Sequence, residues 1–155
     1  LTVASVEGIT SHTFSNRLLC AEAVQMASPR TLVICSDGFR GVDNNKRLSI
    51  LEDAVLAKVL CDAWFKARDA NGEANSPERW TTLRNEMISN DALAQRGYQL
   101  GVDRCVYVAE GVYAKTAKMV ATTLEAIVGA VLEDGGDDAV MRVIQHLGFL
   151  NHRFL

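Results

Sequence analysis

The sequence lacks the signals of a membrane or exported protein. No apolar run approaches the roughly 18 residues of a membrane-spanning helix. No charged-then-apolar export signal opens the chain, so we expect an intracellular protein; because the first residue is Leu1 rather than Met, a removed leader stays open. There is also no internal repeat, low-complexity tract or interdomain linker. The 155 residues therefore predict a single domain, 1–155, with enough chain to bury a sizeable core.

Concentrated positive charge is also missing. The 16 Lys and Arg residues stand against 19 Asp and Glu residues, which gives a formal net charge of −3. The cations are scattered, and no basic tract is present. Phosphate contacts need clustered Lys and Arg. The sequence therefore argues against strong autonomous nucleic-acid binding, although folding can still gather scattered cations into a patch.

The cysteines form no Cys-x-x-Cys pair, which argues against a zinc site. The four are Cys20, Cys35, Cys61 and Cys105. All except Cys35 lie among apolar neighbours, which is typical of small core residues. An even number would permit two disulfides in an oxidising compartment, and the sequence leaves their redox state open.

The chain is rich in helical periodicity. Apolar residues recur at spacings of three and four over 48–64, which predicts a helix with one broad buried stripe. The same period and the capping signals predict helices at 15–26, 77–88, 90–101 and 116–132, with a last helix after Gly135-Gly136. The apolar run 31–35 fits either a strand or buried irregular chain. The predicted fold class is all-α.

One stretch is specific enough to name a family. Residues 45–56 read N-K-R-L-S-I-L-E-D-A-V-L, which resembles the signature helix N-E-R-L-E-F-L-G-D-A-V-L of ribonuclease III. Three further segments, at 12–19, 89–102 and 121–136, resemble the family's other motifs in the same order, so the resemblance covers roughly residues 8–148. It implies an all-α, homodimeric endonuclease domain. We expect no double-stranded-RNA-binding domain, as in single-domain members and fungal ribonuclease III-like proteins.

The resemblance implies a degenerate metal site. Family members use two acids four residues apart on the signature helix and two acids three residues apart on a later helix. These spacings place each pair on one helix face, where the carboxylates hold Mg²⁺ (or Mn²⁺). Carried over, the four positions are Ser49, Asp53, Thr122 and Glu125. Only Asp53 and Glu125 are acids, and they are the catalytic and metal-binding candidates. Two neutral hydroxyls predict much weaker metal binding.

Several other polar residues have a structural interpretation. Asp53 and Glu125 can be remnants, hydrogen-bonded to Ser49 and Thr122. Glu52 replaces the family's glycine and can supply a substitute carboxylate for the metal, but on a helix it points about 100° from Asp53. The sequence favours a solvated helix residue there. The three histidines match no family site, and helix capping explains the acids at 134, 137 and 138.

The resemblance also implies a homodimer. Family signature helices pair across a two-fold axis and form the valley that takes the RNA duplex. An apolar residue at the position of Ile50 commonly packs into the partner subunit. Ile50 lies outside the apolar stripe of 48–64, which suits an interface role.

Three functions follow as hypotheses, and whether the chain is an enzyme stays open. The first is a ribonuclease III-type endoribonuclease acting on double-stranded or structured RNA, with two-metal phosphodiester hydrolysis weakened or lost and RNA binding weak without an RNA-binding domain. The second is a pseudonuclease, an RNA- or protein-binding dimer similar to ribosome-associated relatives. The third is a valley repurposed for a small-molecule ligand or reaction.

Overall fold

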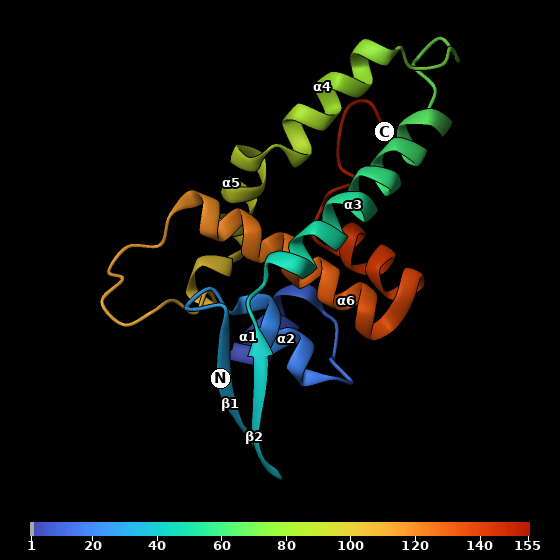
Figure 1. Cartoon of the computed structure of the whole chain (residues 1–155). Coiled ribbons are helices and arrows are strands. Elements are labelled where there is room, and N and C mark those ends of the chain that lie inside the picture. The colour runs from blue at the N-terminus through green and yellow to red at the C-terminus, as the bar shows by residue number, and fades with distance from the viewer. Residues whose placement is uncertain (1) are drawn as a thin grey trace.

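The computed structural model describes residues 2–155 and is mostly helical, which confirms the all-α class (Figure 1). The elements in chain order are α1 (Thr2–Thr10), α2 (Arg17–Val24), β1 (Arg30–Cys35), β2 (Gly38–Asp43), α3 (Lys46–Lys66), α4 (Pro77–Ile88), α5 (Asn90–Leu100), the short 3-10 helix η1 (Val102–Arg104) and α6 (Ala117–His146). In the part of the chain described, no helix is both long and apolar enough to cross a bilayer.

The two central helices, α3 and α6, pack against each other more extensively than any other pair. In Figure 1 they cross near the middle of the molecule, with α1 and α2 on one side and α4 and α5 on the other. The crossing requires a glycine, because a Cβ at Gly129 would collide with the backbone carbonyl oxygen of Leu48. Buried side chains from both helices, such as Leu56, Leu60 and Leu124, fill the surrounding core.

The helix boundaries follow the capping residues that the sequence carries. The Ser76 hydroxyl accepts a hydrogen bond from the Arg79 N–H at the start of α4. Ser89 does the same for Ala92 at the start of α5. Gly101 ends α5 in the left-handed conformation, with φ of 79°. These caps satisfy backbone groups that a helix end leaves open, and the predicted helices at 77–88 and 90–101 are confirmed.

The long helix α6 is two helical segments joined at a glycine. Gly136 has φ of 75° and ψ of −169°, which no helix interior contains. From the sequence, the first helix was predicted to end at Gly135-Gly136 and a second helix to begin after this pair. Both predictions are confirmed. The 48–64 prediction is confirmed as α3, and the predicted helix over 15–26 is the shorter α2.

The structure adds helix α1 and strand β2, which the sequence did not predict. The run 31–35, for which the sequence left a strand and buried irregular chain open, is the strand β1 and pairs antiparallel with β2. The hairpin projects from the helical body in Figure 1. Its cross-strand pair Ile34 and Phe39 is exposed, as is Leu32. The four cysteines are free; Cys20 and Cys105 are buried as expected, whereas Cys61 is only half-buried.

We predict that Gly129→Ala destabilises the fold by about 2 kcal/mol or more, because the new methyl group meets backbone, which cannot move aside as a side chain does. The matched control is Gly8→Ala in α1, where an added Cβ meets nothing within 4 Å. This control gains helix propensity and should stabilise by about 0.5–1 kcal/mol. Urea unfolding of both variants tests the prediction; equal stabilities would contradict it.

Candidate functional site

The α3–α6 crossing brings the two surviving acids near each other. Asp53 comes from α3 and is exposed, whereas Glu125 comes from α6 and is half-buried. Burial raises the pKa of Glu125, and repulsion from the Asp53 carboxylate raises it further, to about 7. Two carboxylates that lie this close repel each other when both are ionised. The pair that the sequence resemblance implies is thus within electrostatic reach.

The two replaced positions add no negative charge to this pair. The Ser49 hydroxyl donates a 2.9 Å hydrogen bond to the backbone carbonyl of Lys46 on its own helix. Thr122 is half-buried. Within residues 2–155, no hydrogen bond joins either hydroxyl to Asp53 or Glu125. The interpretation of the acids as hydrogen-bonded remnants is therefore wrong for this structure.

The prediction that Glu52 is solvated is also wrong. Glu52 is only 1% exposed, and its Oε1 atom has no hydrogen-bond partner. The physical reason is its register, because Glu52 lies four residues after Leu48 and four before Leu56, in the buried row of α3. Burial raises the pKa of Glu52 to about 9, and the charges of Glu125 and Asp53 add to the shift. The carboxyl group is therefore protonated at neutral pH.

This donor set does not fit a four-carboxylate magnesium cage. Across residues 2–155, no group of three or more His, Cys, Asp or Glu side chains is placed to hold a metal ion. Magnesium prefers charged oxygen ligands in octahedral geometry. Here two of the four positions are neutral hydroxyls, and the third nearby carboxyl, Glu52, is buried in its neutral form. Asp53 and Glu125 are the only charged ligands that the four positions offer.

A buried amide anchors the start of α3. The Asn45 side chain donates hydrogen bonds to the Ala23 carbonyl at 3.1 Å and to the Thr123 hydroxyl at 3.2 Å. It thereby joins the ends of α2 and α3 to α6, one residue from Thr122. Asn45 is fully buried. Asn45 is the first residue of the signature stretch, and nothing in the sequence alone assigns it this role.

Ile50 is 73% exposed, as expected for an interface residue. A cavity of about 470 Å³ lies beside it on the same chain, lined by side chains that include Leu19, Leu51 and Glu133. An exposed apolar side chain next to a cavity is the arrangement that a two-fold contact can use, since each copy offers both parts.

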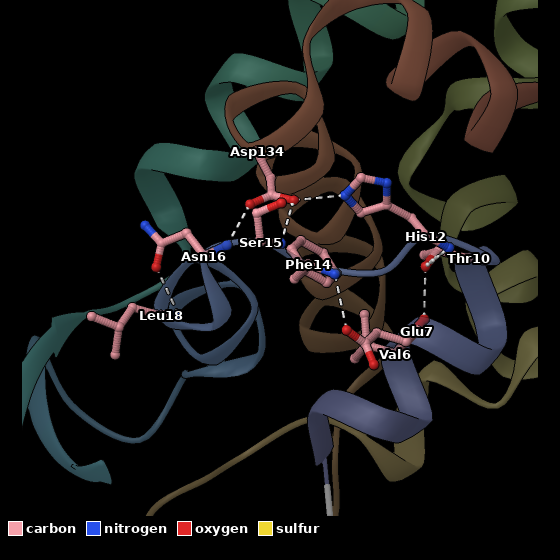
Figure 2. A network of polar contacts seen from close by, with 9 residues as sticks. All are labelled: Val6, Glu7, Thr10, His12, Phe14, Ser15, Asn16, Leu18 and Asp134. Carbon is pink, nitrogen blue, oxygen red and sulfur yellow. Dashed lines mark hydrogen bonds and ion pairs between the residues drawn. The ribbon is translucent and has the colours of Figure 1, made fainter. Parts of the chain in front are cut away.

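Asp134 does not cap a helix; it binds backbone N–H groups of the α1–α2 loop, while the Asn16 side chain caps α2. Figure 2 shows its carboxylate between His12 and the backbone N–H groups of Ser15 and Asn16. Burial opposes ionisation of Asp134, but the hydrogen bonds from Asn16, Ser15 and His12 outweigh it and hold its pKa below the ordinary value. This network ties the α1–α2 loop to α6.

The fold and the paired helices define a ribonuclease III nuclease domain. The family model described as Ribonuclease-III-like matches residues 36–150, and the chain belongs to this family. Ribonuclease 3 of Coxiella burnetii (strain CbuK_Q154) is 31% identical over 108 residues, which are 67% of this chain and 45% of that protein. Ribonuclease 3 of Syntrophotalea carbinolica is 29% identical over 153 residues, which are 96% of this chain and 62% of that protein.

The solved nuclease domain of ribonuclease III from Campylobacter jejuni has the same fold, with a TM-score of 0.73 and 19% identity. The alignment covers 94% of this chain and 95% of that one. By contrast, this chain spans about half the length of the curated relatives it matches.

We predict that stability falls as the pH rises from about 5 through 9. A carboxyl whose folded pKa is raised contributes stability that is fully present below its unfolded pKa, 4.5 for Glu52, and is lost as the pH passes the folded value of about 9. Glu52→Gln stays neutral and should flatten this slope, leaving the part that belongs to Glu125. Urea unfolding between pH 5 and 9 measures how the free energy of unfolding depends on pH in both proteins.

The control for this prediction is Glu110→Gln in an exposed loop, which should keep the wild-type slope. A Glu52→Gln variant with an unchanged pH dependence would show that the carboxyl is not buried in its neutral form.

Proposed function

We propose that this domain forms a homodimer through α3 and binds double-stranded or structured RNA, with two-metal phosphodiester hydrolysis weakened or lost. The observation that carries the proposal is the state of the α3–α6 site, where Asp53 and Glu125 remain but hydroxyls stand at the other two positions. Membership of the ribonuclease-III-like family and the names of the curated relatives support RNA as the ligand.

The loss of hydrolysis follows from charge. Family enzymes use divalent metals, which activate water and stabilise the leaving oxygen. At neutral pH, Glu52 is protonated and Glu125 is close to its pKa of about 7, so the three acids together carry far less than three negative charges. This residual charge is a poor counterpart for two divalent cations. A domain that binds the duplex without cutting it is the limiting case of the proposal.

The dimer proposal rests on Ile50 and the cavity beside it. In a two-fold arrangement, Ile50 of each copy fills the cavity of the other and removes two apolar side chains from water. The same cavity is lined by exposed Arg47 and by the acids Glu22 and Glu133. The surface therefore offers charges of both signs for a self-complementary contact.

We predict that Ser49→Glu combined with Thr122→Asp restores cleavage of a long RNA duplex in Mg²⁺ or Mn²⁺. Charged groups that stabilise a phosphoryl transition state contribute on the order of 100-fold each, so the double variant should exceed the wild type by about that factor or more. Adding Asp53→Asn should abolish the gain. Manganese affinity, followed by the electron paramagnetic resonance of free Mn²⁺, should rise in the double variant in parallel.

Two results would contradict this proposal. One is wild-type protein that already cleaves the duplex at the rate of the double variant. The other is a folded double variant that gains Mn²⁺ affinity but neither binds nor cuts RNA, which would separate the fold from any RNA ligand.

We predict that Ile50→Asp converts a dimer into a monomer at micromolar concentration, because it places a charge in the apolar contact. Sedimentation velocity measures the change. The control is Tyr113→Asp, which alters a fully exposed loop residue and should leave the dimer intact. A monomeric wild type, or a dimeric Ile50→Asp variant, would contradict the proposal that α3 forms the dimer interface.

A further inference from the structure

A second polar cavity lies away from the α3–α6 carboxylates. It has a volume of about 520 Å³, opens to solvent and lies between the α1–α2 loop and the second half of α6. Its polar lining consists of Thr10, Ser11, His12, Thr13, Arg142 and His146. None of these residues belongs to the metal positions or to the cavity beside Ile50.

Ser11 is the most unusual of these residues. It is the one non-glycine residue within 2–155 with a positive φ, 54°, directly after α1. Helices often end in this left-handed conformation, but the residue there is usually glycine, since a Cβ is strained in it. Ser11 keeps a side chain at this cost, and its hydroxyl lies 3.3 Å from Nε2 of His146. A residue held in a strained conformation with its side chain in a cavity is often part of a functional site.

The His12 ring is held in place by buried groups. Its Nε2 lies 2.9 Å from Oδ2 of Asp134, a side chain that is 1% exposed (Figure 2). Gly135 packs directly against the ring, since a Cβ there would approach its Cε1 to 3.0 Å. The second ring nitrogen, Nδ1, makes no hydrogen bond within the described residues. Because Nε2 donates to the Asp134 carboxylate, Nδ1 carries a proton and can donate to a ligand when the ring is in its imidazolium form.

Arg142 supplies a permanent positive charge. It lies one helical turn before His146, on the same face of α6. No described carboxylate forms an ion pair with Arg142, including Asp138 one turn earlier. Asp134, the carboxylate nearest to His12, is already occupied by His12 and two backbone N–H groups. The cavity therefore gathers a guanidinium, two imidazoles and hydroxyls in a chain whose net charge is negative.

We propose that this cavity binds a phosphoryl group, with Arg142 as the charged ligand and Ser11, His12 and His146 as hydrogen-bonding partners. A guanidinium bonds phosphate oxygens through paired N–H groups, and the hydroxyls together with the histidine rings in their imidazolium form complete a donor set around a tetrahedral anion. The volume is in the range of small-ligand pockets and exceeds a phosphate ion, so it leaves room for an attached sugar. The phosphoryl group comes either from a phosphomonoester or from an RNA backbone.

The test is a titration of the intact chain with inorganic phosphate at constant ionic strength, followed by the imidazole NMR signals. The signals of His12 and His146 should shift along one saturating curve with a Kd of about 1 mM or below. His152 is the internal control, because it is paired with Glu86 elsewhere at 2.7 Å and should not follow that curve. Shifts that stay linear in phosphate, or that His152 shares, would overturn the proposal.

Two variants distinguish binding from general charge effects. Arg142→Gln should weaken phosphate binding about tenfold, as expected for a lost charged hydrogen bond. Arg84→Gln removes the same charge from an exposed position on α4 and should leave the affinity unchanged. An Arg142→Gln variant that binds phosphate as the wild type does would overturn the proposal.

Ser11→Gly separates a ligand role from helix capping. Glycine removes the backbone strain at φ of 54°, so the variant should be as stable as the wild type or more stable, yet it should bind phosphate more weakly. Unchanged affinity would overturn the role of the hydroxyl.

An RNA duplex with 5′-hydroxyl ends identifies the source of the phosphoryl group. Histidine shifts that this duplex causes and inorganic phosphate reverses indicate backbone phosphodiesters. Shifts that inorganic phosphate causes and the duplex does not indicate a phosphomonoester.

Discussion

The close crossing of α3 and α6 is the constraint on which the site depends. At Gly129 the missing side chain lets the carbonyl of Leu48 lie against α6. One turn along each helix from this point, Glu52 and Glu125 are brought together, with Asp53 at the exposed edge. The anchoring of α3 by Asn45 fixes the rotation of the helix. A different crossing would carry these carboxyls apart, whatever their identity.

The electrostatics of the crossing are consistent with a site that is stable without a cation. Four carboxylates at such close range would repel strongly, and a family metal site relieves that repulsion by binding metal. Here two acids are replaced by hydroxyls, Glu52 is protonated, and the pKa of Glu125 is about 7. Bound protons and neutral side chains thus remove the repulsion that bound metal relieves in the family site. This agrees with the proposed loss of two-metal hydrolysis.

Most helices could be predicted from the sequence because local signals determine them. The apolar spacing of α3 and the hydroxyl caps of α4 and α5 act within a few residues. The resemblance to ribonuclease III, rather than any local signal, placed Asp53 and Glu125 at one helix pair. Helix α1 was missed because it has neither a capping signal nor charged residues at its ends. Strand β2 was missed because its glycine-rich, exposed sequence shows no apolar alternation.

Residues whose environment is tertiary could not be placed in the same way. Glu52 was assigned to solvent because of its charge, although its four-residue spacing from Leu48 and Leu56 already put it in the buried row. Ser11 and His146 are separated by 135 positions, and only the folded chain brings them to 3.3 Å. The same holds for Asp134, whose partners lie on the α1–α2 loop.

The most direct measurement is a pH titration of the side-chain carboxyl ¹³C signals of the wild-type chain. We expect the Glu52 signal to stay in its protonated position through pH 7 and to change near pH 9, while the Glu125 signal changes near pH 7. A Glu52 signal that titrates near 4.5, together with an unshifted Glu125, would place both carboxyls in water and contradict the α3–α6 arrangement.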